Sequence, residues 1–179
     1  MEKGFVRLAA PDIQCDSIVD GEGIRSVIWF QGCSHHCKEC QNPETWDFNA
    51  GYETSIDDVK KMIDDLELQA GVTFSGGDPM MQVEALEELA AYVKEKGMNV
   101  WVYTGYTYEE LMKLAESNEH YRSVLNYIDY LVDGRFEIAK KSFDVIFRGS
   151  TNQRIIDVQA SLKENKIVEP EKYKYIEKK

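Results

Sequence analysis

Residues 32–43 read Gly-Cys-Ser-His-His-Cys-Lys-Glu-Cys-Gln-Asn-Pro and carry the thiols of Cys33, Cys37 and Cys40 within eight residues. Packing does not explain so many cysteines in so short a loop, whereas a metal centre does. Cysteine thiolates hold iron-sulfur clusters, normally with one thiolate for each iron of a four-iron cluster. Three cysteines therefore indicate a cluster in which one iron lacks a protein ligand, and an open coordination position is typical of a catalytic metal site.

A zinc site is the alternative interpretation of the same loop. The three cysteines and either His35 or His36 would complete a tetrahedral set of ligands. Glycine-rich turns elsewhere in the chain favour the cluster, because a structural zinc module needs no second ligand pocket. With a cluster in the loop, we expect His35 and His36 to be solvated loop residues.

The spacing Cys-x3-Cys-x2-Cys resembles that of the radical S-adenosylmethionine enzymes. In that family S-adenosylmethionine chelates the fourth iron of a 4Fe-4S cluster. One electron from the reduced cluster breaks a carbon-sulfur bond of the sulfonium, and the resulting 5'-deoxyadenosyl radical abstracts a hydrogen atom. The resemblance implies this chemistry here, with Cys33, Cys37 and Cys40 as the metal-binding and catalytic residues.

A second candidate site is the stretch Ser-Gly-Gly-Asp-Pro at residues 75–79. Asp at an N-cap with Pro at the first helical position is a frequent helix start that needs no ligand. Two glycines also let the backbone approach a bound molecule closely. The family places Gly-Gly-Glu at this point to bind the amino group of S-adenosylmethionine, so the resemblance gives this role to Gly76, Gly77 and Asp78.

The position before the third cysteine departs from the family pattern. It is often aromatic in the family, but here it is Glu39. Stacking of this side chain on adenine is therefore not expected. The resemblance implies instead that backbone groups of Glu39 and Gln41 contact adenine.

Short apolar runs alternate with helical patterns along the chain. Strands are predicted at residues 5–9, 26–30, 72–74, 99–103, 130–132, 144–147 and 154–158. Helices are predicted after Ser55 and Thr107, each with an acidic residue three positions on, and between residues 79 and 97.

Glycine and a polar residue follow five of these strands. Loops at the carboxyl ends of parallel strands converge on one site. The last connections are too short for parallel crossovers, so we expect an α/β fold with a mostly parallel sheet, antiparallel edge pieces and one open side. With the resemblance, this implies an incomplete, open TIM-barrel-like radical S-adenosylmethionine fold.

Residues 20–25, Asp-Gly-Glu-Gly-Ile-Arg, form a turn pattern before the cysteine loop. The pattern is similar to the Asp-Gly-Pro-Gly-x-Arg element that precedes the cluster loop in activating enzymes of glycyl-radical proteins, with Glu22 in place of the proline. Two interpretations of Arg25 stay open. It orients a partner's backbone or a carboxylate, or it forms an ordinary surface salt bridge.

Residues 40–46, 101–107 and 148–154 narrow the resemblance to the activating proteins of anaerobic ribonucleoside-triphosphate reductases. The first stretch is shared with the pyruvate formate-lyase activator. The resemblance implies removal of a glycine α-hydrogen to form a glycyl radical on the large subunit of the anaerobic ribonucleotide reductase, with reduced flavodoxin or ferredoxin as electron donor. The enzymatic alternatives are pyruvate formate-lyase activase and a radical enzyme acting on a small molecule, such as a deazaguanine synthase.

The chain of 179 residues is 43% hydrophobic, which suffices for one packed core. We expect a single domain over residues 1–179, with a charged tail at residues 161–179. A net charge of -11 without a basic cluster argues against nucleic acid. No apolar run approaches the roughly 20 residues that span a bilayer, so we expect a cytoplasmic protein with no membrane partner. Cys15, outside the loop, is expected to be a small buried hydrophobe.

Overall fold

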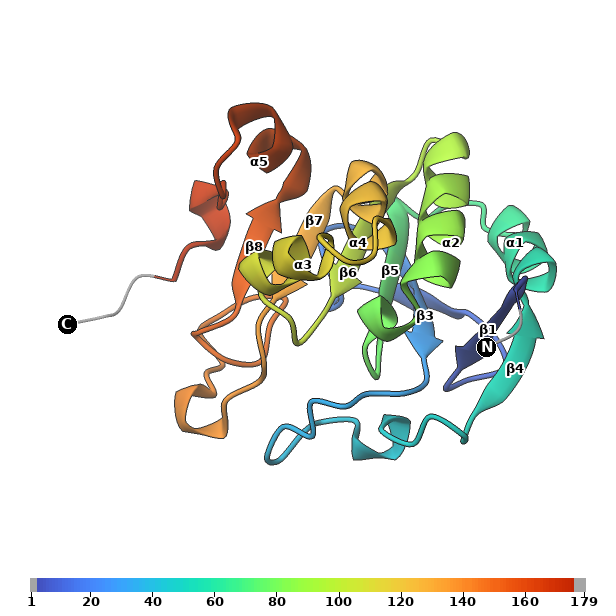
Figure 1. The fold of residues 1–179 in the computed structure, drawn as a ribbon, viewed down its shortest axis with the longest axis horizontal. Helices are drawn as coiled ribbons and strands as arrows, with labels where there is room; N and C mark the ends of the chain where they lie inside the picture. Colours follow the sequence, from blue (N-terminus) through green and yellow to red (C-terminus); the bar gives the residue numbers. More distant parts are fainter. Residues whose placement is uncertain (1–2, 176–179) are drawn as a thin grey trace.

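The computed structural model describes residues 3–175 as an α/β fold around one eight-stranded sheet (Figure 1). The strand order is β4-β1-β3-β5-β6-β7-β8, with β2 paired to β3 beside this path. The strands are β1 (Phe5–Leu8), β2 (Gln14–Ser17), β3 (Arg25–Phe30), β4 (Tyr52–Ser55), β5 (Gly71–Gly76), β6 (Asn99–Tyr103), β7 (Tyr130–Asp133) and β8 (Arg154–Asp157). The helices are α1 (Ile56–Asp64), α2 (Val83–Glu95), α3 (Tyr108–Leu114), α4 (His120–Ser123) and α5 (Val158–Glu164), and 3-10 turns lie at Pro43–Thr45, Pro79–Gln82, Val124–Tyr127, Ile138–Lys140 and Glu171–Tyr173.

Strands β3, β5, β6 and β7 run parallel in the middle of the sheet, while β1, β2, β4 and β8 pair antiparallel with their neighbours. The predicted mostly parallel sheet with antiparallel edges is therefore confirmed. The register sets Phe30 opposite Gly76 and Tyr103 opposite Val132, so the carboxyl ends of the parallel strands lie nearly level. The long loops after β3 and β7 consequently lie at one edge of the sheet (Figure 1).

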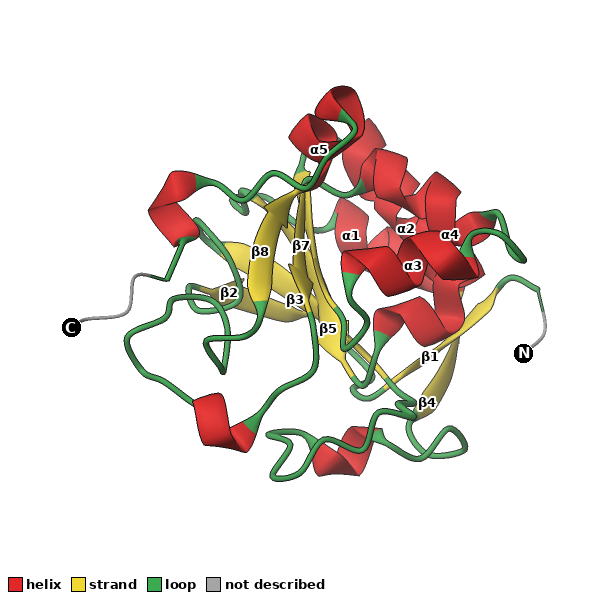
Figure 2. Cartoon of the chain, turned by 60° about the vertical axis from the view of Figure 1, so that its left-hand side comes forward, coloured by secondary structure: helices red, strands yellow, loops and turns green. Residues whose placement is uncertain are grey.

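Helices α1 to α4 lie together on one face of the sheet (Figure 2). Two of them begin where their caps predict. The Ser55 side chain accepts a hydrogen bond from the Asp58 N–H at the start of α1, and Thr107 forms a capping box with Glu110 at the start of α3. None of the helices within residues 3–175 has the length and apolar surface that crossing a bilayer requires.

The main hydrophobic core fills the space between these helices and the sheet. Val100 and Val102 of β6 face this core, and Trp101 between them points to the opposite face, as the alternation of side chains along a strand requires. There Trp101 packs against Tyr173, with ring centroids 5.8 Å apart.

The structure describes the predicted charged tail at residues 161–179 as far as residue 175, and residues 176–179 lie outside the described part of the chain. Helix α5 includes residues 158–164, and Tyr173 is only 4% exposed. The Tyr173 hydroxyl donates to the Glu22 carboxylate over 2.7 Å, which ties this segment to the turn before β3. A single apolar residue among charged ones has no periodicity, so its burial is not visible in the sequence.

Two local predictions are wrong, and two strands of the sheet were not predicted. Residues 144–147 were predicted as a strand and form a loop. In this loop Val145 is buried, and Phe147 has a left-handed backbone with φ of 56°. The prediction failed because a short apolar run can pack inward without pairing as a strand. Cys15 is exposed on β2 instead of buried. Strands β2 and β4 were not predicted, because both are short, largely exposed strands at the edge of the sheet and have no apolar run.

Both open interpretations of Arg25 are wrong. Its side chain is fully buried and donates to Thr73 Oγ1 over 2.8 Å, to Val72 O over 2.9 Å and to Asn99 Oδ1 over 2.6 Å. The guanidinium also lies 5.5 Å from the ring centroid of Trp101. Burial lowers the pKa of Arg25 to about 10. Arg25 therefore joins three strands of the sheet and is not available to a partner.

Candidate functional site

The cysteine loop follows β3 and is closed by backbone hydrogen bonds. Gly32 N donates to Thr45 O over 2.8 Å, and Cys33 N donates to Trp46 O over 3.1 Å. Cys33 is 7% exposed, while Cys37 and Cys40 are half-buried, and all three thiols are free. The loop thus holds three cysteines without disulfide bonds at the carboxyl edge of the parallel strands.

These cysteines line one cavity of about 460 Å³. The loops after β5, β6 and β7 and the segment before β8 complete the wall, so sequence-distant segments meet as the strand order predicts. Among the candidate cofactor residues, Gln41, Gly76 and Gly77 line this cavity, whereas the side chains of Glu39 and Asp78 do not. A ligand-sized cavity of this volume is typical of cofactor and substrate sites.

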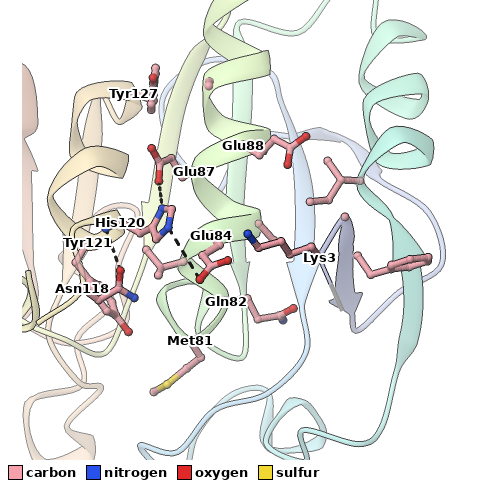
Figure 3. A pocket seen from close by; sticks show the side chains of 16 residues that line it. Lys3, Met81, Gln82, Glu84, Glu87, Glu88, Asn118, His120, Tyr121 and Tyr127 are labelled. Carbon is pink, nitrogen blue, oxygen red and sulfur yellow. Dashed lines mark hydrogen bonds and ion pairs between the residues drawn. The ribbon is translucent and has the colours of Figure 1, made fainter. Parts of the chain in front are cut away.

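A second cavity, of about 630 Å³, lies beside α2 and α4 (Figure 3). Glu84, Glu87 and His120 line it, and His120 Nδ1 is 2.6 Å from a Glu87 oxygen. These acidic groups hold the pKa of His120 above its ordinary value. None of the candidate site residues contributes to this cavity, so the cysteine-lined cavity is the candidate site although it is the smaller one.

Asp78 is fully buried, and its carboxylate is occupied by protein groups. Oδ2 accepts hydrogen bonds from Thr104 Oγ1 and Gly105 N, both at 2.9 Å, and lies 2.7 Å from His35 Nε2. Oδ1 accepts the Met80 N–H as an N-cap, so the structural interpretation of this Asp is confirmed. Asp78 thereby joins the turn after β5 to the turn after β6 and to the cysteine loop.

The expectation of solvated histidines is wrong for His35, whose side chain is 5% exposed. Its Nε2 faces Asp78, and its Nδ1 accepts from Arg135 Nε over 3.3 Å. This network assigns the ring proton to Nε2. His36 is exposed and stacks on Trp46, with centroids 4.7 Å apart. Both imidazoles therefore have partners other than the cysteines.

Residues 3–175 contain no group of three or more His, Cys, Asp or Glu side chains arranged around a single metal ion. A zinc ion requires its ligands to converge on one point, about 2.3 Å from each sulfur. A four-iron cluster binds each thiolate at a different iron, so its three cysteines need no common point. The arrangement of the thiols around a cavity fits the cluster better than the zinc site.

The turn after β5 is joined to the cysteine loop by backbone hydrogen bonds. Gly77 N donates to Phe30 O over 2.8 Å, and Asp78 N donates to Gly32 O over 2.9 Å. Gly76 has φ of +106°, which favours glycine, and a Cβ there would lie 2.4 Å from Phe30 O. The two glycines therefore let the turn and the cysteine loop form one backbone unit.

Burial raises the pKa of the Cys33 thiol to about 11. Burial also raises the pKa of Cys37, although the positive charge of Arg135 acts in the opposite direction. Metal ligation requires the thiolate, so a metal centre bound here would have to offset this desolvation. An iron-sulfur cluster supplies such a centre.

A model of the 4Fe-4S single cluster domain family matches residues 19–156, which include the cysteine loop and the turn after β5. The chain is 38% identical over 148 residues to the anaerobic ribonucleoside-triphosphate reductase-activating protein of Haemophilus influenzae, covering 77% of this chain and 90% of that protein. It is 35% identical to the activating protein of Escherichia coli strain K12, covering 76% of this chain and 90% of the relative. For the activating protein of Enterobacteria phage T4 the identity is 32%, with 79% and 88% covered.

The chain belongs to the family of anaerobic ribonucleoside-triphosphate reductase-activating proteins. Two side chains at the cavity, those of Thr104 and Trp46, were not predicted from the sequence to belong to the site. Thr104 binds the Asp78 carboxylate, and the Trp46 indole Nε1 is buried without a hydrogen-bond partner among the described residues. Thr104 lies in a strand-end turn that the sequence does mark, whereas nothing in the sequence indicates the unpaired indole.

Replacing Asp78 by alanine is expected to destabilise the protein by at least about 4 kcal/mol, because four buried donors lose their acceptor and each such loss costs about 1–3 kcal/mol. Asn in place of Asp78 retains one acceptor oxygen and should cost less. The measurement is urea unfolding of cluster-free protein. Asp12→Ala, at an exposed position, is the matched control and should change stability by less than about 0.5 kcal/mol. Equal effects of Asp78→Ala and Asp12→Ala would contradict the assigned role.

Proposed function

We propose that this chain is a radical S-adenosylmethionine activase that generates a glycyl radical on the large subunit of an anaerobic ribonucleoside-triphosphate reductase. The observation that carries the proposal is a single cavity lined by three free thiols, those of Cys33, Cys37 and Cys40, together with the backbone of Gly76 and Gly77. A cluster site and a site for a small polar ligand thus share one space. The reductase is the partner because the relatives are named for activating it.

The residues at the cavity fit a 4Fe-4S cluster and S-adenosylmethionine. Three cysteines ligate three irons and leave the fourth open. Cys33, Cys37 and Cys40 would hold the cluster, which when bound and reduced would supply the one electron for cleavage of S-adenosylmethionine and so allow removal of a hydrogen atom from the substrate glycine. Trp46 also lines the cavity, and its ring stacks on His36 of the cysteine loop.

The remaining residues orient and enclose the ligand. Backbone groups of Gly76, Gly77 and Gln41 contact S-adenosylmethionine, and the backbone of Glu39 is the further adenine contact. Asp78 contributes through its backbone and by positioning, because its carboxylate is already occupied. Phe136, Phe147 and Tyr103 line the cavity and limit the access of water to it.

The sheet supports an open, incomplete TIM-barrel-like arrangement. The four parallel strands have an antiparallel neighbour on each side, β1 beside β3 and β8 beside β7, and an antiparallel strand does not continue a parallel barrel. The side left open gives a polypeptide substrate a route to the cavity. Reduced flavodoxin or ferredoxin is the proposed electron donor, and the proposed compartment is the cytoplasm, where free thiols stay reduced.

Electron paramagnetic resonance of the reduced mixture tests this function. Cluster-loaded protein, dithionite, S-adenosylmethionine and the reductase large subunit are expected to give a glycyl-radical signal, and 5'-deoxyadenosine should form. The same mixture without the subunit should give no such signal. A signal with pyruvate formate-lyase instead would reassign the partner, and a colourless, zinc-loaded protein would favour the zinc module.

A further inference from the structure

We infer that residues 165–175, which follow α5, form a strap that holds one wall of the cysteine-lined cavity in place, with Tyr173 as its anchor. The wall is the segment of residues 147–149, which lines the cavity together with the three cysteines. The strap lies beyond residue 156, where the match to the family model ends. The use of this cavity as an active site rests on the proposed function, whereas the strap is tested without it.

The strap crosses the edge of the sheet at β8. Val168 O accepts the Asp157 N–H over 2.8 Å, and the Val168 N–H donates to Ser161 Oγ over 2.9 Å. Ile167 packs against the main core between the helices and the sheet. The last 3-10 turn, Glu171–Tyr173, then lies on the other side of the sheet from α1 to α4 (Figure 2). The strap therefore reaches the face of the sheet that these helices leave uncovered.

Tyr173 is the anchor because its ring completes an aromatic cluster on that face. The side chain is 4% exposed. Its ring centroid lies 5.8 Å from that of Trp101, 6.0 Å from that of Tyr130 and 6.1 Å from that of Phe147. Edge-to-face contacts at such distances stabilise aromatic pairs beyond the area that they bury. Trp101 and Tyr130 belong to the sheet, whereas Phe147 belongs to the cavity wall, so the anchor joins the wall to the sheet.

Hydrogen bonds fix the anchor at both of its ends. Arg148 Nη2 donates to Tyr173 O over 2.6 Å, and the Tyr173 hydroxyl donates to the Glu22 carboxylate over 2.7 Å. Lys172 also pairs with Glu22, but both side chains are more than half exposed, so this ion pair contributes little. Burial lowers the pKa of Arg148, and the charge of Glu169 in the strap acts in the opposite direction. The Arg148 side chain is thus turned toward the strap.

The wall depends on these contacts for its shape. Phe147 has φ of 56°, a strained backbone conformation for a residue other than glycine, which persists only where surrounding contacts impose it. Phe143 and Ile146, earlier in the same loop, are 94% and 51% exposed and do not pack the loop onto the protein. Tyr103 Oη donates to Phe147 O over 2.7 Å, and the Tyr173 ring packs against the Phe147 ring. Loss of Tyr173 should therefore release the wall toward solvent.

A released wall opens the cavity beside the cysteine loop. A Cβ at Gly149 would lie 3.6 Å from Gln41 Nε2, so the wall and the loop are close there, and Cys33 is only 7% exposed. Such an opening costs less than unfolding of the sheet, because only local contacts are lost. Under the proposed function, a closed wall keeps water away from the reacting groups. The strap thereby controls how readily solvent reaches the cysteines.

The rate at which the loop thiols of cluster-free protein react with dithiobis-nitrobenzoate measures this access. The parent protein is Cys15→Ala, so that only the three loop cysteines report. In this parent, Tyr173→Ala should raise the rate by about tenfold or more, because a ring contact and a hydrogen bond that hold the wall are lost. Tyr173→Phe keeps the ring and loses only the bond to Glu22, so its rate should lie between those two. Neither cluster nor S-adenosylmethionine is present, so failure of the proposed function leaves these rates unaffected.

Tyr92→Ala in the same parent is the matched control. Tyr92 is a half-buried tyrosine of α2 whose hydroxyl binds Asp64 over 2.8 Å, on the helix-covered side of the sheet. Its replacement should leave the rate close to that of the parent. Opening of the wall exposes little surface, so the rate of Tyr173→Ala should be nearly independent of low urea concentrations, whereas a reaction through global unfolding accelerates steeply with urea.

Three results would overturn the strap. They are a rate of Tyr173→Ala no faster than that of the parent, an equal acceleration in Tyr92→Ala, and a steep urea dependence of the Tyr173→Ala rate. Should Tyr173→Ala not fold, Tyr173→Phe is compared with the parent and with Tyr92→Ala in the same way, and an unchanged rate in Tyr173→Phe then overturns the strap.

Discussion

Alanine in place of Cys33, Cys37 or Cys40 is expected to leave the protein colourless after anaerobic incubation with iron and sulfide. Each variant lacks one of three thiolates around an already incomplete cluster, so no protein ligand replaces the missing one. Formation of 5'-deoxyadenosine should fall by more than about 100-fold, since even groups that only support a metal ligand contribute about 10–100-fold. Iron content, visible absorbance and product formation with dithionite measure the effect.

Cys15→Ala is the matched control for these variants. Cys15 is exposed on β2, its thiol lies near Ile13 O at 3.8 Å, and it does not line the cavity. Its replacement should leave iron content and product formation at wild-type levels. Full iron loading of any of the three loop variants would remove that cysteine from the ligand set.

Alanine in place of Gly77 is expected to reduce 5'-deoxyadenosine formation by roughly 100-fold, the size of effect that follows a displacement of about 1 Å in a reacting group. A Cβ at Gly77 would lie 2.5 Å from Gly32 O and 2.9 Å from Thr45 O. Both are backbone atoms of the cysteine loop, so the loop must shift to make room. Overpacking of this kind costs about 1–3 kcal/mol, and the free energy of unfolding should fall accordingly.

In Gly77→Ala the added Cβ would therefore collide with the backbone of the protein itself and not with a bound ligand. The control is Gly97→Ala. Gly97 has φ of +77°, but a Cβ there meets nothing within 4 Å. That variant should lose about 1 kcal/mol through backbone strain and keep its activity. Normal product formation by Gly77→Ala would separate the turn from the active site.

Several elements were predictable because their causes are local. The starts of α1 and α3 follow from Ser55 and Thr107, whose side chains bind N–H groups only three residues away. The strand Asn99–Tyr103 was predicted at its observed bounds, since a short run of β-branched and aromatic residues between polar ones specifies it. Parallel pairing was predictable from the helices between strands.

Part of the candidate site was also predictable, because it is built from residues that are close together in the sequence. Cys33, Cys37 and Cys40 lie close together because eight residues of chain connect the first to the last. The glycines at residues 76 and 77 led us to predict a close approach of the backbone to a bound molecule, and in the structure the neighbouring protein backbone blocks their Cβ positions. The sequence therefore located the cavity wall that these segments form.

By itself, the sequence determined the cysteine loop, the order of the parallel strands with the helices between them, and the edge of the sheet where the loops meet. Only the tertiary structure decided which way the polar side chains face: His35 and Asp78 toward each other, and Arg25 into the sheet. The physical reason is sequence separation. Capping and metal-ligand spacing depend on neighbours a few residues away, whereas the burial and pairing of these groups depend on segments that only the folded chain brings together.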